Sequence, residues 1–135
     1  MAEKFQLEIV SPDRSVLTEG VEEVVLPSVE GYFGVLAGHA PMLAQLAVGE
    51  VSYRLGQKRK HLAISGGYVE VLRGSVHVLA RTAERAQEID LERAMRAKEQ
   101  ARAALERDLG PDEFRRAEVR LQRALSRISV HQHGV

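Results

Sequence analysis

The spacing of apolar residues changes near residue 84, and this change limits the folds open to the chain. Before that point, apolar and polar side chains alternate over short segments, as at Phe5, Leu7 and Ile9. Alternation is the period of a strand with one buried face. Beyond Glu84, apolar residues recur every three or four positions, the period of an amphipathic helix. The 135 residues therefore predict an α+β protein, a β part followed by a helical part.

The first part, residues 1–84, is expected to be an antiparallel β-sandwich domain. Apolar runs predict short strands near residues 5–9, 21–26, 51–55, 62–64, 68–71 and 76–80. Turn-type residues, such as Ser11-Pro12-Asp13-Arg14, separate these runs. Short strands with such turns are typical of a sandwich or barrel. No helix-length segment lies between them, which disfavours a parallel α/β sheet.

The second part, residues 85–135, is expected to be an antiparallel two-helix hairpin. Asp90 is a good N-cap for the first helix, and Gly110-Pro111 ends it because proline cannot continue a helix. Each helix is expected to have roughly 19 residues, or about 28 Å. The second is expected to end near Val130 and to leave residues 131–135 as a frayed tail. The stripes that face each other are predicted to be Leu91, Ala94, Ala97, Ala101, Ala104 and Leu105, and Phe114, Ala117, Leu121, Ala124, Leu125 and Ile128.

These stripes are rich in alanine, so the helices bury little area against each other. Alanine and arginine are strong helix formers, and each helix can persist when the two separate. The hairpin can therefore act as a switch that closes on itself or opens against another surface. A static hairpin is the alternative that the sequence leaves open.

Four arginines of the second helix share one face: Arg116, Arg120, Arg123 and Arg127. Antiparallel pairing places Arg93 at the level of Arg127, beside the N-terminus of the first helix. A helix N-terminus with several guanidinium groups favours an anion, so these residues predict an anion site. Alternatively, the arginines pair with Glu88, Glu92 or Glu118 on a solvated surface.

Composition and missing motifs narrow the function classes. The chain has 19 basic and 19 acidic residues, and this balance argues against a general nucleic-acid binder. Because four arginines share one helix face, a module that binds an acidic surface or a nucleic acid stays an alternative. The absence of cysteine excludes disulfides and thiolate metal sites. The sequence lacks phosphate-binding glycine loops, the HExxH spacing of zinc sites and nucleophile elbows. We therefore expect neither an enzyme nor a metal site. His131 and His133 are expected to be loose terminal metal ligands at most.

No apolar run approaches the roughly 18 residues that span a bilayer, and the first residues lack the pattern of a signal peptide. We therefore expect a cytosolic protein, one that can still sit on a membrane complex.

Two segments resemble a known family. Residues 34–41, GVLAGHAP, resemble the GVLxGHAP signature of the ε subunit of F-type ATP synthases. Residues 65–71, SGGYVEV, continue the resemblance, which covers nearly the whole chain. It implies a non-catalytic subunit of the rotor stalk at the cytoplasmic face of the bacterial cell membrane.

The resemblance also implies partners. The sandwich would hold the γ subunit and touch the ring of c subunits, with Tyr32 and His39 in a loop from Val29 to Pro41 as candidate contacts. The hairpin would rise along γ toward the catalytic α/β subunits and inhibit ATP hydrolysis, with the basic face Arg116, Arg120, Arg123 and Arg127 against acidic surface.

Some bacterial members bind ATP on the hairpin through a motif I/L-D-x-x-R-A, and no other cofactor is implied. Residues 89–94, I-D-L-E-R-A, fit each fixed position with Ile89, Asp90, Arg93 and Ala94. The resemblance adds Glu84, Arg123 and Arg127 as ATP-binding positions. Gln100 stands where ATP-binding relatives carry a further arginine. ATP is thus expected as a regulatory ligand that favours the closed, non-inhibitory hairpin, and a nucleotide-blind hairpin is the alternative.

Overall fold

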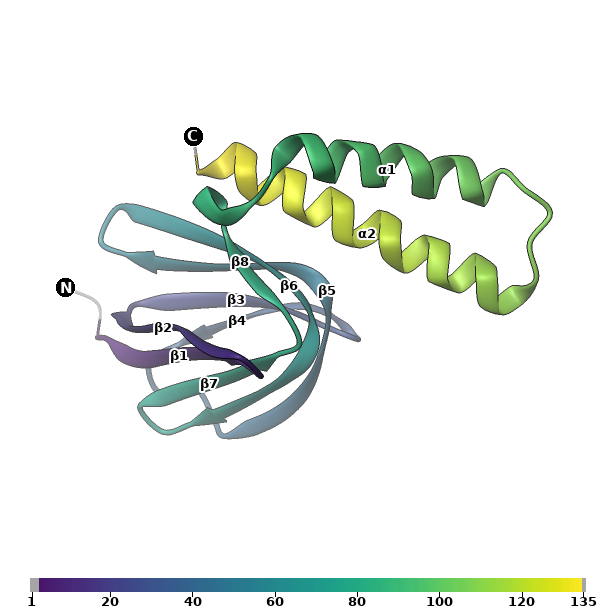
Figure 1. The fold of residues 1–135 in the computed structure, drawn as a ribbon. Helices are drawn as coiled ribbons and strands as arrows, with labels where there is room; N and C mark the ends of the chain where they lie inside the picture. The colour runs from purple at the N-terminus through teal and green to yellow at the C-terminus, as the bar shows by residue number, and fades with distance from the viewer. Residues whose placement is uncertain (1–2, 135) are drawn as a thin grey trace.

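The computed structural model describes residues 3–134, with a curved sheet followed by two helices (Figure 1). The strands are β1 Phe5–Ser11, β2 Arg14–Val21, β3 Glu23–Ser28, β4 Gly31–Leu36, β5 Met42–Leu55, β6 Lys58–Leu72, β7 Ser75–Ala80 and β8 Ala83–Arg85. A 3-10 turn, η1 Ala86–Glu88, leads into α1 Leu91–Leu105 and α2 Pro111–His133. The predicted order, strands first and a two-helix hairpin second, is therefore confirmed.

The strands form one sheet in the order β2-β1-β7-β6-β5-β3-β4, and β8 pairs with β6 beside that path. Neighbouring strands run antiparallel except β1 and β7, which pair in parallel from Gln6↔Ser75 to Val10↔Leu79. This parallel pair is a single departure from the expected antiparallel sandwich. The parallel pair joins strands far apart in the sequence, so it needs no local crossover helix.

The predicted strands were too few and too short. β2 and β4 lack regular alternation, and β5 begins at Met42, ahead of the strand expected from residue 51. The segment from Val29 to Pro41, expected as a loop, contains β4. β6 also runs through Gly66 and Gly67, which have φ of +81° and +129° and bend the strand. A Cβ at Gly67 would lie 1.9 Å from the Leu79 carbonyl oxygen, so the bend requires glycine. Beyond it, β6 changes partner from β8 to β7.

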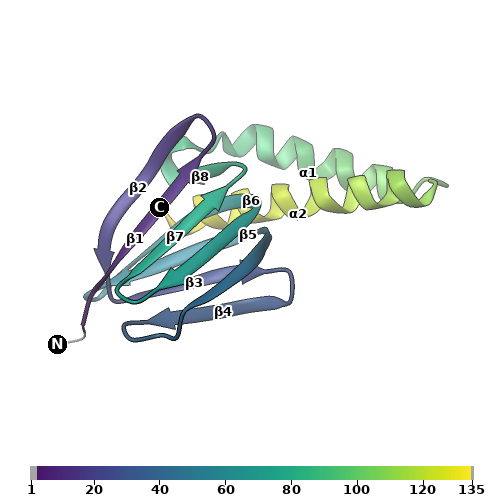
Figure 2. The same ribbon diagram turned by 90° about the horizontal axis from the view of Figure 1, so that it is seen from below.

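Buried side chains from both ends of the sheet meet in one core. Leu7 of β1, Leu26 of β3 and Val69 of β6 are fully buried in the same cluster. The sheet therefore folds over on itself as a sandwich, and Figure 2 shows β3 and β4 on the side of the sandwich away from β2.

The helices form the predicted antiparallel hairpin with different lengths. The side chain of Asp90 accepts a hydrogen bond from the Arg93 backbone N–H at 3.1 Å and caps α1, as expected. α1 has 15 residues and α2 has 23, against roughly 19 expected for each. α2 continues through His133 and is capped by Gly134, so the expected frayed tail is wrong for residues 131–133; Val135 lies outside the described residues.

Only part of the predicted apolar stripes is buried. Ala94, Ala101, Ala117 and Ala124 are buried at the helix–helix contact. Phe114 and Leu125 are about two-fifths exposed, so their assignment to the buried stripe is wrong. The helices approach through alanines, and the larger apolar side chains lie beside the contact.

α2 lies between α1 and the sheet, and its C-terminal half carries the contact with the sandwich (Figure 1). Val130 packs in a small buried cluster with Ala63 of β6 and Ile89. Ser126 Oγ donates a hydrogen bond of 2.8 Å to the Gly49 carbonyl. Within residues 3–134, neither helix is long and apolar enough to cross a membrane.

Candidate anion-binding groove and the linker that supports it

A groove of about 550 Å³ runs between α1 and α2 and is lined almost entirely by alanines and arginines. Its lining consists of Arg93, Ala97, Gln100, Ala101, Ala104, Arg107, Arg120, Arg123, Ala124 and Arg127. Alanine side chains end at Cβ, so they leave space that longer side chains would fill. The prediction that Arg93, Arg123 and Arg127 converge is confirmed by this lining.

The groove carries more positive than negative charge. Arg127 forms an ion pair with Glu84 of β8, with Nε–Oε1 at 2.7 Å and Nη2–Oε2 at 3.1 Å. Arg93, Arg107, Arg120 and Arg123 form no ion pair with any residue between 3 and 134. The alternative that these arginines pair with Glu88, Glu92 or Glu118 is therefore wrong, since Glu88 pairs with Arg14. Unpaired guanidinium groups on two facing helices suit an anion with several oxygens.

Other predicted residues support the groove without lining it. Asp90 caps α1 at the groove's end, and Ala94 is fully buried between the helices. Ile89 packs under the start of α1 with Val130. Arg116 lies on the same helix face one turn nearer the interhelical loop, and it is not part of the lining. Of the predicted basic face, Arg120, Arg123 and Arg127 line the groove, and Arg116 lies outside it.

Sequence reasoning missed Arg107, which follows α1 in the loop and lines the groove. The position of Arg107 could have been predicted from the antiparallel pairing, because that pairing brings the end of α1 close to the start of α2. Gln100 does lie in the groove, so its amide is placed to contact a ligand there.

Tyr32 lies near the start of β4, and His39 follows its end. Tyr32 lies in β4, where its hydroxyl accepts a hydrogen bond of 3.1 Å from the Glu50 backbone N–H of β5. His39 follows the other end of β4, where its Nδ1 lies 2.7 Å from the Ala40 carbonyl oxygen. Their role as subunit contacts stays a prediction.

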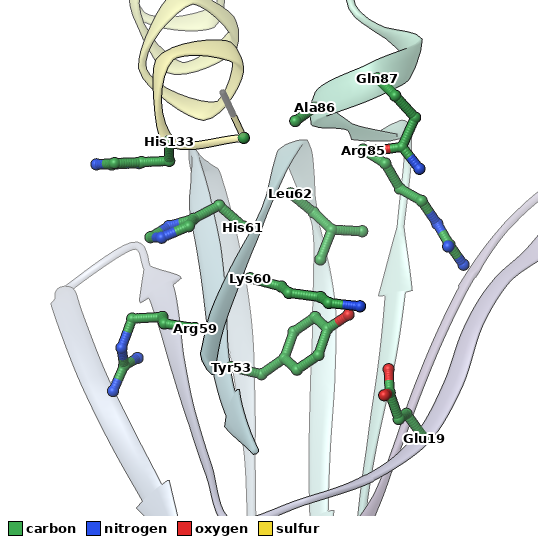
Figure 3. A pocket seen from close by; sticks show the side chains of 11 residues that line it. Glu19, Tyr53, Arg59, Lys60, His61, Leu62, Arg85, Ala86, Gln87 and His133 are labelled. Atoms are coloured by element: carbon green, nitrogen blue, oxygen red, sulfur yellow. The ribbon is translucent and has the colours of Figure 1, made fainter. Parts of the chain in front are cut away.

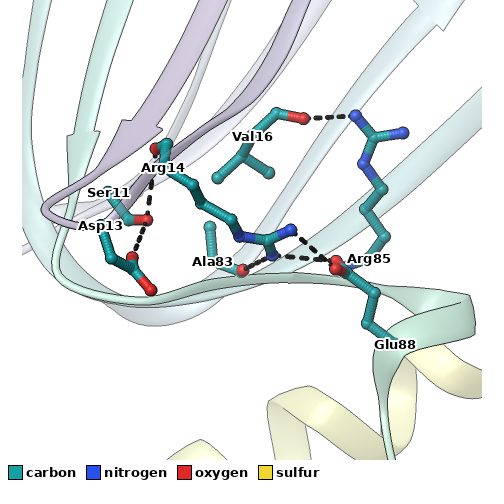
Figure 4. A network of polar contacts seen from close by, with 7 residues as sticks. All are labelled: Ser11, Asp13, Arg14, Val16, Ala83, Arg85 and Glu88. Atoms are coloured by element: carbon teal, nitrogen blue, oxygen red, sulfur yellow. Dashed lines mark hydrogen bonds and ion pairs between the residues drawn. The ribbon is translucent and has the colours of Figure 1, made fainter.

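A polar network holds the linker between the two parts (Figure 4). Arg14 of β2 contacts both carboxylate oxygens of Glu88, at 2.7 and 3.1 Å, and donates to the Ala83 carbonyl at 3.0 Å. Arg85 donates to the Val16 carbonyl. The hydrogen bond from Arg14 lowers the pKa of Glu88, and the same bond raises the pKa of Arg14. The linker that leads to Asp90 is thereby fixed to the sandwich.

A second cavity of about 310 Å³ lies where the end of α2 meets the sandwich (Figure 3). Tyr53 lines it, and burial, with the nearby Glu19 carboxylate as a smaller cause, raises the pKa of Tyr53 to about 12. His61 lines it as well, and burial followed by repulsion from His133 lowers the pKa of His61. The sequence offered no sign of this cavity, because its residues come from strands and a helix end far apart in the chain.

Two family models cover nearly the whole chain. Residues 4–86 match the ATP synthase delta/epsilon chain β-sandwich domain, and residues 87–132 match the ATP synthase delta/epsilon chain long α-helix domain. The ATP synthase epsilon chain of Syntrophobacter fumaroxidans is 51% identical over 130 residues, which are 96% of this chain and 97% of that protein. The epsilon chain of Geotalea daltonii is 48% identical over 132 residues, 96% of this chain and 95% of that protein.

Solved structures agree with these relatives. A chain in the cryo-EM structure of the Euglena gracilis mitochondrial ATP synthase, OSCP/F1/c-ring in rotational state 1, superposes with a TM-score of 0.78 at 30% identity. The match covers 90% of this chain and 78% of that chain.

A β-sandwich followed by a helical hairpin, with family models matching both parts, defines a two-part stalk subunit of a rotary ATP synthase. The chain belongs to the ATP synthase delta/epsilon family. Its bacterial relatives are epsilon chains, so the prediction of a non-catalytic ε subunit of the F-type central stalk is confirmed.

Proposed function

We propose that the groove between α1 and α2 binds ATP and that bound ATP favours the closed hairpin. The observation that carries this proposal is the set of arginines from both helices around one groove, with Arg127 alone neutralised, by Glu84. A triphosphate matches such a groove because its oxygens accept hydrogen bonds from several guanidinium groups at once. Arg93 lies near the N-terminus of α1, where the helix dipole also favours negative charge.

The same arrangement explains why closure would depend on a ligand. Without an anion, the closed hairpin holds several positive charges near one another, and like charges repel. The alanine contact supplies little buried area to offset that repulsion. A ligand that binds only the closed form stabilises it by about 2.7 kcal/mol at a hundredfold excess over Kd.

In the assembled enzyme, the open hairpin would reach the catalytic α/β subunits and inhibit ATP hydrolysis. Arg116 would contribute there through charge, since it is exposed and outside the groove. The sandwich would hold γ and touch the c ring at the cytoplasmic face of the bacterial membrane. Exposed apolar side chains on the sandwich, among them Leu43, Tyr68 and Leu79, support a subunit contact there.

Titration calorimetry of the chain with ATP and with ADP tests the nucleotide site. We expect saturable ATP binding that is lost in an Arg123→Ala/Arg127→Ala double variant. An Arg115→Ala/Arg116→Ala double variant is the matched control, because it removes the same charge from the same helix outside the groove. Equal ATP binding by both double variants, or none by the parent chain at millimolar ATP, would contradict the proposal and favour a nucleotide-blind hairpin.

Inhibition needs a separate test on the catalytic complex. Added chain should suppress ATP hydrolysis, less so at high ATP, and a chain truncated after residue 84 should not suppress it. Arg116→Ala should weaken suppression while ATP binding stays at the parent value. Steeply salt-dependent binding to DNA would instead favour the nucleic-acid alternative.

A further inference from the structure

Two imidazoles and one carboxylate join the end of α2 to the sandwich. Glu50 lies on β5, His61 on β6 and His133 in the last turn of α2. Glu50 Oε1 lies 2.6 Å from Nδ1 of His61 and 2.6 Å from Nδ1 of His133. The ligand atoms of the three side chains all lie within 4.8 Å of one another. One oxygen and two nitrogens therefore lie close together at this junction.

The surroundings hold these side chains in place. The His61 and His133 rings stack with centroids 4.0 Å apart and planes at 23°, as Figure 3 shows from the side. Ser129 Oγ donates a hydrogen bond of 2.9 Å to the second carboxylate oxygen of Glu50. An outer hydrogen bond of this kind orients a carboxylate and leaves its other oxygen available as a ligand.

One atom of the cluster lacks a satisfactory partner. His61 Nδ1 is buried and makes no hydrogen bond of acceptable geometry, although Glu50 Oε1 is close to it. Buried polar atoms in folded proteins nearly always have a hydrogen-bond partner or another ligand. A cation between the imidazole nitrogens and the carboxylate would satisfy this atom.

We propose that Glu50, His61 and His133 bind one divalent transition-metal ion, with Zn²⁺ as the best match. Two imidazole nitrogens and one carboxylate oxygen are ligands that Zn²⁺ accepts, with water in the fourth position. Mg²⁺ and Ca²⁺ are disfavoured because they prefer oxygen ligands. The sequence predicted His133 only as part of a loose terminal tail, and its place in an ordered helix turn is what brings it to the cluster.

The site needs a small adjustment to admit the ion. Zinc–ligand bonds are about 2.0–2.2 Å, so ligand atoms around a tetrahedral ion lie about 3.3 Å apart. The two contacts of 2.6 Å must therefore lengthen by less than about 1 Å. The His133 side chain is 47% exposed at the helix end and has room to move. Each neutral imidazole would carry its proton on Nε2, which leaves Nδ1 free for the metal.

The bound ion would connect β5, β6 and α2. Opening of the hairpin carries His133 away from Glu50 and His61, so opening would break one metal bond. The metal would thus favour the closed arrangement at the end of α2. None of the three residues lines the arginine groove, so this inference does not depend on the nucleotide proposal.

Zinc titration calorimetry on the full chain, after removal of metals with EDTA and without nucleotide, tests the site. We expect one Zn²⁺ per chain and a higher Tm in its presence. His61→Ala, His133→Ala and Glu50→Gln should each weaken binding at least tenfold, since losing even an outer partner of a ligand costs about 10–100-fold in metal affinity. His77→Ala is the matched control, because His77 has a single carboxylate partner, Glu8 at 3.0 Å.

The visible absorption of Co²⁺ bound to the parent chain tests the site without any variant. Visible bands of a four-coordinate ion with nitrogen and oxygen ligands would support the site. The absence of Zn²⁺ binding by the parent chain would overturn the proposal. Binding that survives His61→Ala but is lost in His131→Ala would also overturn it, because the ligands would then be the terminal histidines alone.

Discussion

The sandwich and the hairpin are held together by different means. The sandwich buries large apolar side chains from β1 to β7 in one cluster, many of them fully. The hairpin has four buried alanines where its helices meet, and α2 contacts the sandwich through Val130 and a few polar groups. Apolar burial scales with area, so the sandwich core contributes more stabilisation than the contact between the two helices. This difference in packing is why the proposed opening is assigned to the hairpin and not to the sandwich.

A core substitution should give the largest effect and unfold the sandwich as a unit. Leu7 is fully buried, and replacing such a leucine with alanine costs about 2–5 kcal/mol because a cavity remains. Urea unfolding followed by circular dichroism measures the loss. Leu43→Ala is the control, since Leu43 is 73% exposed and its change should stay within about 0.5 kcal/mol. Equal losses for both would mean that the sandwich core is not the source of stability.

Overpacking the helix contact should affect the hairpin alone. Ala124 is 2% exposed and faces α1, so leucine there forces the helices apart at a cost of about 1–3 kcal/mol. Hydrogen exchange should show faster exchange in α1 and α2 with unchanged protection in the strands. Ala103→Leu, at an exposed position of α1, should leave both parts unchanged. Loss of strand protection in Ala124→Leu would show that the two parts do not separate.

Sequence patterns predicted the division into strands and helices because burial on one face imposes a period of two or of about 3.6 residues. Strands without alternating burial cannot be predicted from this period. In β2, Val16 and Leu17 are both buried next to a register shift in the β1–β2 pairing, and in β4 only Val35 is buried. The parallel β1–β7 pairing joins segments about 70 residues apart, and no local pattern reports such a pairing.

The two candidate sites also differ in how far regular spacing predicts them. Arg93, Arg123 and Arg127 were brought together by helix spacing and antiparallel pairing, which are regular and predictable from sequence. The Glu50, His61 and His133 cluster depends on where α2 ends on the sheet, which no regular spacing determines. A site built on one supersecondary unit can thus be read from the chain, and a site between units needs the structure.

A single polar contact of α2 should matter less than the packing changes. Ser126 Oγ donates to the Gly49 carbonyl at 2.8 Å, and Ser126→Ala leaves that partly buried carbonyl without this donor at a cost of about 1 kcal/mol. Exchange of the α2 amides should be faster by several-fold, while α1 capping and the sandwich are unaffected. Gln122→Ala, exposed on the same helix, is the control. An unchanged exchange rate in Ser126→Ala would show that apolar packing alone holds α2 to the sheet.

The smallest effect is expected at the linker, where acid should weaken the Arg14–Glu88 pair. The folded state lowers the pKa of Glu88 below its ordinary value of 4.5, so the pair stabilises the fold above that value. The stabilisation is lost as pH falls through the lowered pKa, because the carboxylate becomes protonated.

The Arg14 and Glu88 side chains are both one-third or more exposed, so the pair contributes at most about 1 kcal/mol. Urea unfolding of the parent chain and of Glu88→Gln should therefore differ at neutral pH and converge as the pH falls below the lowered pKa of Glu88, where the carboxylate is protonated in both states. Glu99→Gln, which removes an exposed charge of α1 that pairs with no residue in the described part of the chain, should show no such convergence. A difference between the parent chain and Glu88→Gln that persists at low pH would show that Glu88 acts by packing and not through its charge.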